Sequence, residues 1–141
     1  MNQYMKIVNE LAKKAALNGE VPIACVIVYK DEIVGKAYNL REQEQKIIAH
    51  AEILAILEAS KNIGSWKLND CEMYISTEPC LMCYGAIIQS RIKKIYVGSC
   101  QDNRKKIAYT NYVDLDEIID YSYVNEESSK IIKSFFQKKR K

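Results

Sequence analysis

An α/β fold of three layers is what the sequence predicts, with helices on both faces of one mixed five-stranded sheet. Two apolar runs separated by a short polar turn follow a first helical segment, which is the pattern of a β-hairpin. Further apolar runs then alternate with segments of helical periodicity, as in units that build parallel strands. The 141 residues match the size of one domain, so we expect residues 1–141 to form a single domain.

The helices are predicted from apolar residues that recur every three or four positions. We expect helices over residues 4–17, 49–60, 80–90 and 128–139, and a short helical piece over 115–119. Asn18-Gly19 and Asn62-Ile63-Gly64 end the first two, because glycine and asparagine adopt the backbone conformation that terminates helices. In the last helix, Ile131, Ile132, Phe135 and Phe136 are expected on the inner side. Because neighbouring residues on a helix face different ways, one of the two phenylalanines is expected to enter the core.

Short apolar runs between polar or glycine residues predict the strands. We expect strands over residues 22–29, 33–38, 71–76, 95–98 and 121–124. The first run is almost continuously apolar, which is typical of a strand covered on both faces. The polar stretches 40–46 and 101–111 are expected to be irregular loops.

Composition and cysteine usage point to a cytoplasmic protein without membrane attachment. No apolar run approaches the roughly 20 residues that span a bilayer, and the first residues lack the layout of a signal peptide. Five cysteines in such a chain favour metal ligands or core positions over disulfides. Cys25 and Cys71 fall in expected strands and are expected in the core, whereas the role of Cys100 stays open.

Basic residues gather in the second half of the chain, although the net charge is only +3. Lys138, Lys139, Arg140 and Lys141 are consecutive, and a second group lies between Arg91 and Lys106. A basic edge of this kind fits a polyanionic partner, and it equally fits an ordinary solvated surface with a frayed tail. Charge alone leaves both interpretations open.

Two short motifs contain the residues with the clearest chemical role. His50, the only histidine, stands two positions before Glu52, and Cys80 and Cys83 follow Pro79. Together they form H-x-E and P-C-x-x-C, the signature of zinc-dependent nucleobase deaminases. Cysteines three apart at the start of a helix point to the same side, and the helix start favours the thiolate that a metal requires.

The number of ligands indicates a catalytic metal. A structural zinc site has four protein ligands, whereas a catalytic site leaves one position for water. His50, Cys80 and Cys83 supply three, and the chain has no second histidine. Glu52 is conceivable as a fourth ligand, but its place beside His50 is better suited to carrying protons between an activated water and a base.

At these motifs the chain resembles the bacterial tRNA-specific adenosine deaminases of the cytidine deaminase-like superfamily. The similar blocks include Glu20-Val21-Pro22-Ile23, the two motifs with their flanking residues, Ser90-Arg91-Ile92, and Ser134-Phe135-Phe136 with the basic residues that follow. The resemblance implies a cytidine deaminase-like fold, one Zn²⁺ per subunit, and hydrolytic conversion of wobble adenosine 34 of tRNA to inosine. It also implies a homodimer, with Ile87 and Ile88 as candidate interface residues.

Carried over residue by residue, the resemblance assigns roles at the site. It places zinc on His50, Cys80 and Cys83, and the proton shuttle on Glu52. It assigns contacts with the flipped-out base to the Asn39 side chain and the Ala51 backbone amide. It implies contacts with the tRNA anticodon stem-loop from residues near the C-terminus: Phe135, Phe136, Lys138, Lys139 and Arg140.

The chain departs from the family pattern after Gly98, and this bears on substrate choice. Ser99 to Lys106 contains no glycine and has its acidic residue one position later than is usual in the family. Because zinc and Glu52 do not define which ring is attacked, one alternative function is deamination of a free base or nucleoside such as guanine or cytosine. Another is a non-catalytic, zinc-stabilised RNA-binding partner subunit.

Overall fold

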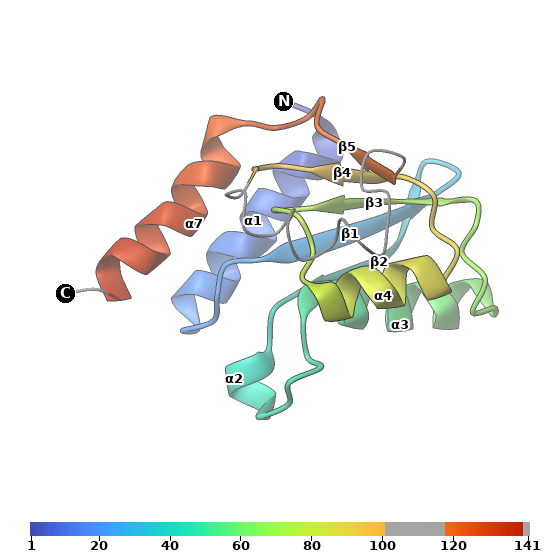
Figure 1. Ribbon diagram of the computed structural model, residues 1–141, viewed down its shortest axis with the longest axis horizontal. Helices are drawn as coiled ribbons and strands as arrows, with labels where there is room; N and C mark the ends of the chain where they lie inside the picture. The colour runs from blue at the N-terminus through green and yellow to red at the C-terminus, as the bar shows by residue number, and fades with distance from the viewer. Residues whose placement is uncertain (101–117, 140–141) are drawn as a thin grey trace.

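The computed structural model describes residues 1–100 and 118–139. In chain order its helices and strands are α1 (Gln3–Leu17), β1 (Ala24–Tyr29), β2 (Glu32–Tyr38), α2 (Arg41–Glu44), α3 (Ala51–Ile63), β3 (Cys71–Ile75), α4 (Leu81–Gln89), β4 (Ile95–Val97), β5 (Ile119–Asp120) and α7 (Glu126–Lys139). The strands form one sheet in the order β2-β1-β3-β4-β5. Figure 1 shows α1 and α7 on one side of this sheet and α3 and α4 on the other. The predicted three-layer arrangement is confirmed.

The sheet is mixed, as the sequence predicts. β1 pairs antiparallel with both β2 and β3, whereas β3, β4 and β5 run parallel to one another. The hairpin turn between β1 and β2 places Lys30 and Asp31 at positive φ, the backbone conformation of a tight two-residue turn that matches the twist of the strands. The βαβ unit β3-α4-β4 brings the segment after β3 to the end of the sheet where α3 also begins.

The interior strand β1 is buried along both faces and divides the core in two. Cys25 and Ile27 pack toward α3 and α4, together with Met73 and Ile75 of β3. The alternate residues Ala24, Val26 and Val28 pack with Met5, Val8 and Ala12 of α1 on the other side. This alternation follows from the period of two along a strand. It also confirms the expected core positions of Cys25 and Cys71, which are both buried.

Close packing of α3 on the hairpin depends on small residues. A Cβ atom on Gly35 of β2 would lie 2.4 Å from the carbonyl oxygen of Ala55 and 3.2 Å from the Cβ of Ala59. Both alanines are fully buried on α3. Glycine therefore lets the backbones of β2 and α3 approach, and this contact sets the height of α3 above the sheet.

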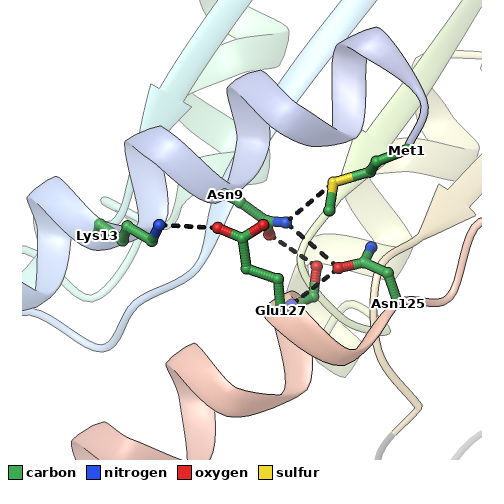
Figure 2. Close-up of polar contacts among 6 residues, drawn as sticks. Met1, Asn9, Lys13, Asn125 and Glu127 are labelled. Atoms are coloured by element: carbon green, nitrogen blue, oxygen red, sulfur yellow. Dashed lines mark hydrogen bonds and ion pairs between the residues drawn. The ribbon is translucent and has the colours of Figure 1, made fainter.

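A buried polar cluster joins α1 to the start of α7 (Figure 2). The Ser128 hydroxyl donates to Asn9 Oδ1 at 2.7 Å, and Asn9 Nδ2 donates to Asn125 Oδ1 at 3.3 Å. Asn125 Oδ1 also accepts from the Ser128 backbone at 2.9 Å, which satisfies an amide at the helix start. An exposed ion pair between Lys13 and Glu127 lies beside the cluster.

Three predicted segments differ most from the structure. The stretch 40–46, expected to be irregular, contains the short helix α2, whose first-turn amides bind a side chain remote in sequence, Glu20. The last strand is Ile119–Asp120 rather than 121–124, because residues 121–124 form a turn that packs the Tyr123 ring against Tyr74 and Tyr96. α3 starts at Ala51 and runs to Ile63.

Other predictions fall partly outside the described residues. The expected loop 101–111 and most of the helical piece 115–119 lie there, and Ile119 belongs to β5. On α7, Ile132 is buried and Phe135 is half-buried, but Phe136 is 42% exposed, so the expected inner side is wrong for Phe136. Among the described residues, no helix is long and apolar enough to cross a membrane.

Candidate metal centre and base pocket

Two helix starts bring the motif residues together. His50 is the residue before α3 and Cys80 is the residue before α4, and both have extended backbone conformations. Cys83 lies in the first turn of α4 and is fully buried. The His50 Nδ1 atom lies 3.7 Å from the Cys80 sulfur and 3.4 Å from the Cys83 sulfur. The structure thus brings together the three residues that the sequence predicts as metal ligands.

The spacing of these atoms fits a tetrahedral Zn²⁺ ion. Zinc bonds of roughly 2.0–2.1 Å to nitrogen and 2.3 Å to sulfur, at a tetrahedral angle, separate the two ligand atoms by about 3.6 Å. The two observed nitrogen–sulfur distances lie on either side of this value. The described residues contain one group of histidine, cysteine or acidic side chains whose possible ligand atoms all lie within 4.8 Å of one another. That group consists of these three residues. Glu52 is not in it, which agrees with a proton carrier rather than a fourth ligand.

The two thiols share one proton in the protein without metal. A hydrogen bond from the Cys83 thiol, supported by the neighbouring His50, lowers the pKa of Cys80 to about 5. The same hydrogen bond raises the pKa of Cys83 well above its usual range, and burial and the nearby Glu52 raise it further. Cys80 is therefore the thiolate at neutral pH, and Cys83 must give up its proton when a metal binds.

A cavity of about 140 Å³ opens beside the metal ligands. Its wall includes His50, Cys80, Ala51, Glu52 and Asn39. Glu52 is buried in the first turn of α3, where it reaches the cavity and interacts with the Cys83 thiol. Asn39 is buried at the end of β2, and its side-chain oxygen accepts a hydrogen bond from the Arg41 backbone at 3.3 Å. The side-chain amide nitrogen is then the group left to donate to a ligand.

The predicted RNA-contact residues lie elsewhere. Phe135 and Lys138 line a separate groove of about 570 Å³ between α1 and α7, and Phe136 packs edge-on against Phe135. Lys139 lies over the Phe135 ring at 5.5 Å, and Arg140 is outside the described residues. Of the described residues among them, Phe135, Phe136, Lys138 and Lys139 are not part of the cavity wall.

Sequence reasoning missed several residues of the cavity wall. Val21 and Ile23 form an apolar part, while Arg41 and Glu78 add charged groups. Glu78 is buried and accepts hydrogen bonds from the Thr77 hydroxyl, the Cys100 thiol and the Tyr121 hydroxyl. Glu78 stands directly before Pro79 of the P-C-x-x-C motif, and this position is the sequence signal that could have identified it. The contact also gives Cys100, whose role the sequence leaves open, a partner at the site.

Comparisons with known proteins agree with this geometry. The family described as the cytidine and deoxycytidylate deaminase zinc-binding region matches residues 1–99, which supports the expected Zn²⁺ cofactor. A tRNA-specific adenosine deaminase of Bacillus subtilis is 38% identical over 144 residues, covering 98% of this chain and 89% of the relative. The chain is also similar to a relative of the same name from Aquifex aeolicus, at 36% identity over 97% of this chain and 94% of the relative.

Solved structures share the fold. One from a study of A-to-I editing by tRNA:A34 deaminases at the wobble position is 32% identical with a TM-score of 0.68, covering 72% of this chain and 77% of that one. A guanine deaminase from Bacillus subtilis is 29% identical with a TM-score of 0.69, covering 99% and 94%. The predicted cytidine deaminase-like fold is thereby confirmed. From the matched zinc-binding region and the near full-length relatives, we conclude that this chain belongs to the family of zinc-dependent tRNA-specific adenosine deaminases.

Proposed function

We propose that this protein hydrolyses the amino group of adenosine at wobble position 34 of tRNA, giving inosine and ammonia. The observation that carries the proposal is the cavity beside the His-Cys-Cys group, with a buried glutamate in its wall. This arrangement occurs in a chain whose full-length relatives are named tRNA-specific adenosine deaminases. The overall reaction consumes one water and leaves the base with a carbonyl oxygen in place of its amine.

His50, Cys80 and Cys83 would hold the zinc ion. Bound there, Zn²⁺ supplies a water acidic enough to act as a nucleophile at neutral pH. Glu52 would accept a proton from the attacking water at its carboxylate and deliver it to a ring nitrogen of adenine. It would then take the second proton, from the hydroxyl that has added to the ring carbon, and pass it to the amine, which leaves as ammonia as the carbonyl forms. Burial of Glu52 in the cavity wall keeps this carboxylate close to both proton donor and acceptor.

Asn39 and Ala51 would orient the base. Asn39 presents its amide to the cavity from the end of β2. The Ala51 amide occupies the first position of α3, where backbone N–H groups have no acceptor within the helix. A base held by these two donors would lie beside the metal ligands and Glu52. Holding a reactant in its productive orientation can lower the barrier of a reaction substantially.

The anticodon stem-loop would extend from the cavity toward α7. Phe136 is exposed on this helix, and aromatic side chains commonly stack on splayed-out bases of single-stranded RNA. The exposed Lys138 and Lys139 in the last turn would contact phosphates, together with Arg140. Phe135 supports Phe136 through their edge-to-face contact, at a ring separation of 5.4 Å.

A substrate panel tests the proposed function. The zinc-loaded protein is incubated with an anticodon stem-loop containing adenosine 34, and separately with guanine, cytosine and free adenosine. Inosine in the RNA digest is the expected result, whereas turnover of guanine alone would favour the function of the Bacillus subtilis structural relative. No turnover of any substrate would favour a non-catalytic partner subunit. Sequencing the wobble position of cellular tRNA with and without the protein would identify the tRNAs used.

We further propose a cytoplasmic homodimer in which residues 1–141 of each subunit form one catalytic domain. Leu57 of α3 and Leu81 and Met82 of α4 are exposed apolar side chains on the same layer, which favours a covered face. Ile87, expected at the interface, is fully buried in its own core and is excluded as a contact. Light scattering after size-exclusion chromatography would measure the subunit number, and a monomer would contradict the dimer.

A further inference from the structure

Glu20 is a fully buried carboxylate that takes no part in the metal centre. It lies between α1 and β1, with none of its surface exposed. Both of its oxygens accept hydrogen bonds from consecutive backbone amides of α2. Oε1 accepts from Glu42 N at 3.0 Å, and Oε2 accepts from Gln43 N at 2.7 Å.

These two bonds join the two backbone segments that form one side of the base cavity. The segment around Glu20 contributes Val21 and Ile23 to the cavity, and the segment held by its carboxylate contributes Asn39 and Arg41. A third bond, from Asn39 N to the Ile23 carbonyl at 3.0 Å, continues the connection toward β1. Glu20 thus determines how far the Asn39–Arg41 segment lies from the apolar part of the cavity wall.

A buried carboxylate is a costly way to fill space, because an apolar side chain would avoid its desolvation. Glu20 instead fixes the direction and spacing of its two hydrogen bonds, which an apolar side chain cannot do. Two charge-assisted hydrogen bonds at a fixed spacing place a four-residue helix that is too short to be stable alone. No side chain of α2 is buried. Without the two bonds to Glu20, side-chain packing would therefore not hold this helix on the protein.

We propose that Glu20 is a positioning residue for deamination, which fixes the Asn39 amide in the cavity and the Arg41 guanidinium at its mouth. The proposal rests on the proposed function. Arg41 lines the cavity with its side chain about half exposed and paired at 3.3 Å with Glu42 on the same turn. A cation at this place contacts an RNA phosphate next to the adenosine that enters the cavity.

A double-mutant cycle tests whether Glu20 acts through Asn39. Glu20→Gln keeps the size but offers only one acceptor, so we expect kcat/KM on the stem-loop to fall about 10- to 100-fold. Asn39→Ala is expected to cause a loss of similar size. The double variant should lose clearly less than the product of the two single losses, because only the Arg41 part of the anchor's role remains once the Asn39 amide is gone. If kcat/KM of the double variant falls by the product of the two single losses, the two residues act independently and the proposal is overturned.

Controls separate positioning from folding. Glu10→Gln makes the same chemical change at an exposed site on α1 and should leave activity unchanged. Zinc content and thermal unfolding are measured for every variant, and Glu20→Asp replaces Glu20→Gln in the cycle if the latter does not fold. Arg41→Gln should raise KM with kcat unchanged and reduce the slope of log affinity against log salt by roughly one. An unchanged slope would contradict the phosphate contact.

Hydrogen exchange distinguishes failure of this proposal from failure of the proposed function. The Glu42 and Gln43 amides should exchange at least about tenfold faster in Glu20→Gln than in Glu10→Gln, while amides of α4 stay unchanged. Exchange that does not change would refute the anchor even if the enzyme is active. If the wild-type protein deaminates no RNA, accelerated exchange confined to these amides still supports the anchor.

Discussion

Replacing Ser128 by alanine removes one hydroxyl from the buried polar cluster between α1 and α7. In the native protein this hydroxyl donates to Asn9 Oδ1 at 2.7 Å, and both side chains are almost completely buried. The substitution removes the hydrogen bond and leaves the Asn9 oxygen without that donor in a site with little access to water. No new steric conflict arises, because alanine is smaller than serine.

The expected cost follows from these contacts. A neutral hydrogen bond contributes about 1 kcal/mol, and a buried acceptor left without a donor adds roughly 1–3 kcal/mol. We therefore expect Ser128→Ala to lower the free energy of unfolding by about 2 kcal/mol. Asn9→Leu should cost about as much, because it leaves the Ser128 hydroxyl without its acceptor, while Asn125 keeps its bond from the Ser128 backbone.

Urea unfolding of the zinc-loaded protein, at one fixed protein concentration, measures these free energies. The double variant replaces both partners by apolar groups, so it should cost about 2 kcal/mol less than the sum of the single variants. If the double variant loses the sum of the two single losses in free energy of unfolding, within about 0.5 kcal/mol, the reasoning is refuted. Glu127→Gln is the control, because it removes only the exposed ion pair with Lys13 and should cost under about 1 kcal/mol.

Three further predictions concern the metal centre and its support. Glu52→Ala should retain zinc and RNA binding but lower kcat by about 10²- to 10⁴-fold or more, as measured by inosine formation and metal analysis; retained turnover would exclude the proton shuttle. The affinity of the metal-free protein for zinc should rise about tenfold from about pH 7 to about pH 8. Zinc binding must displace the tightly held proton of Cys83, whereas Cys80, with a pKa of about 5, has already lost its proton. Competition with a chelator measures this, and an affinity independent of pH would contradict it. Gly35→Ala should destabilise the fold by about 1–3 kcal/mol, because its Cβ would meet the Ala55 carbonyl at 2.4 Å; a stabilised variant in urea unfolding would show that β2 and α3 can separate freely.

The metal site could be predicted from the sequence because its ligands lie in two short motifs, each at the start of a helix. His50 stands directly before a helix, and Cys80 and Cys83 share one helix start, so spacing alone places their side chains. The sequence pattern of alternating elements likewise predicts the mixed sheet, since the apolar runs and helical segments follow the order of β-hairpin and βαβ units.

The parts that could not be predicted depend on contacts between remote residues. Nothing near Arg41–Glu44 shows that a carboxylate some twenty positions earlier will hold that turn, so α2 was not expected. Residues 121–124 have strand-forming side chains, yet they turn because Tyr123 packs on rings of β3 and β4. Glu20 and Arg41 were missed for the same reason, since their roles depend on which segments meet in space.

The division of the molecule into layers has a consequence for how such an enzyme changes over time. The metal ligands and Glu52 belong to α3, α4 and the residues just before them, whereas the groove with Phe135 and Lys138 belongs to α1 and α7 across the sheet. Mutations on α7 can therefore accumulate without moving a metal ligand. If α7 contacts the anticodon stem-loop as proposed, that part of RNA recognition can change independently of the chemistry at the base. Grafting a different terminal helix onto this sheet is then a direct way to test for a zinc deaminase with a new preference for its nucleic acid.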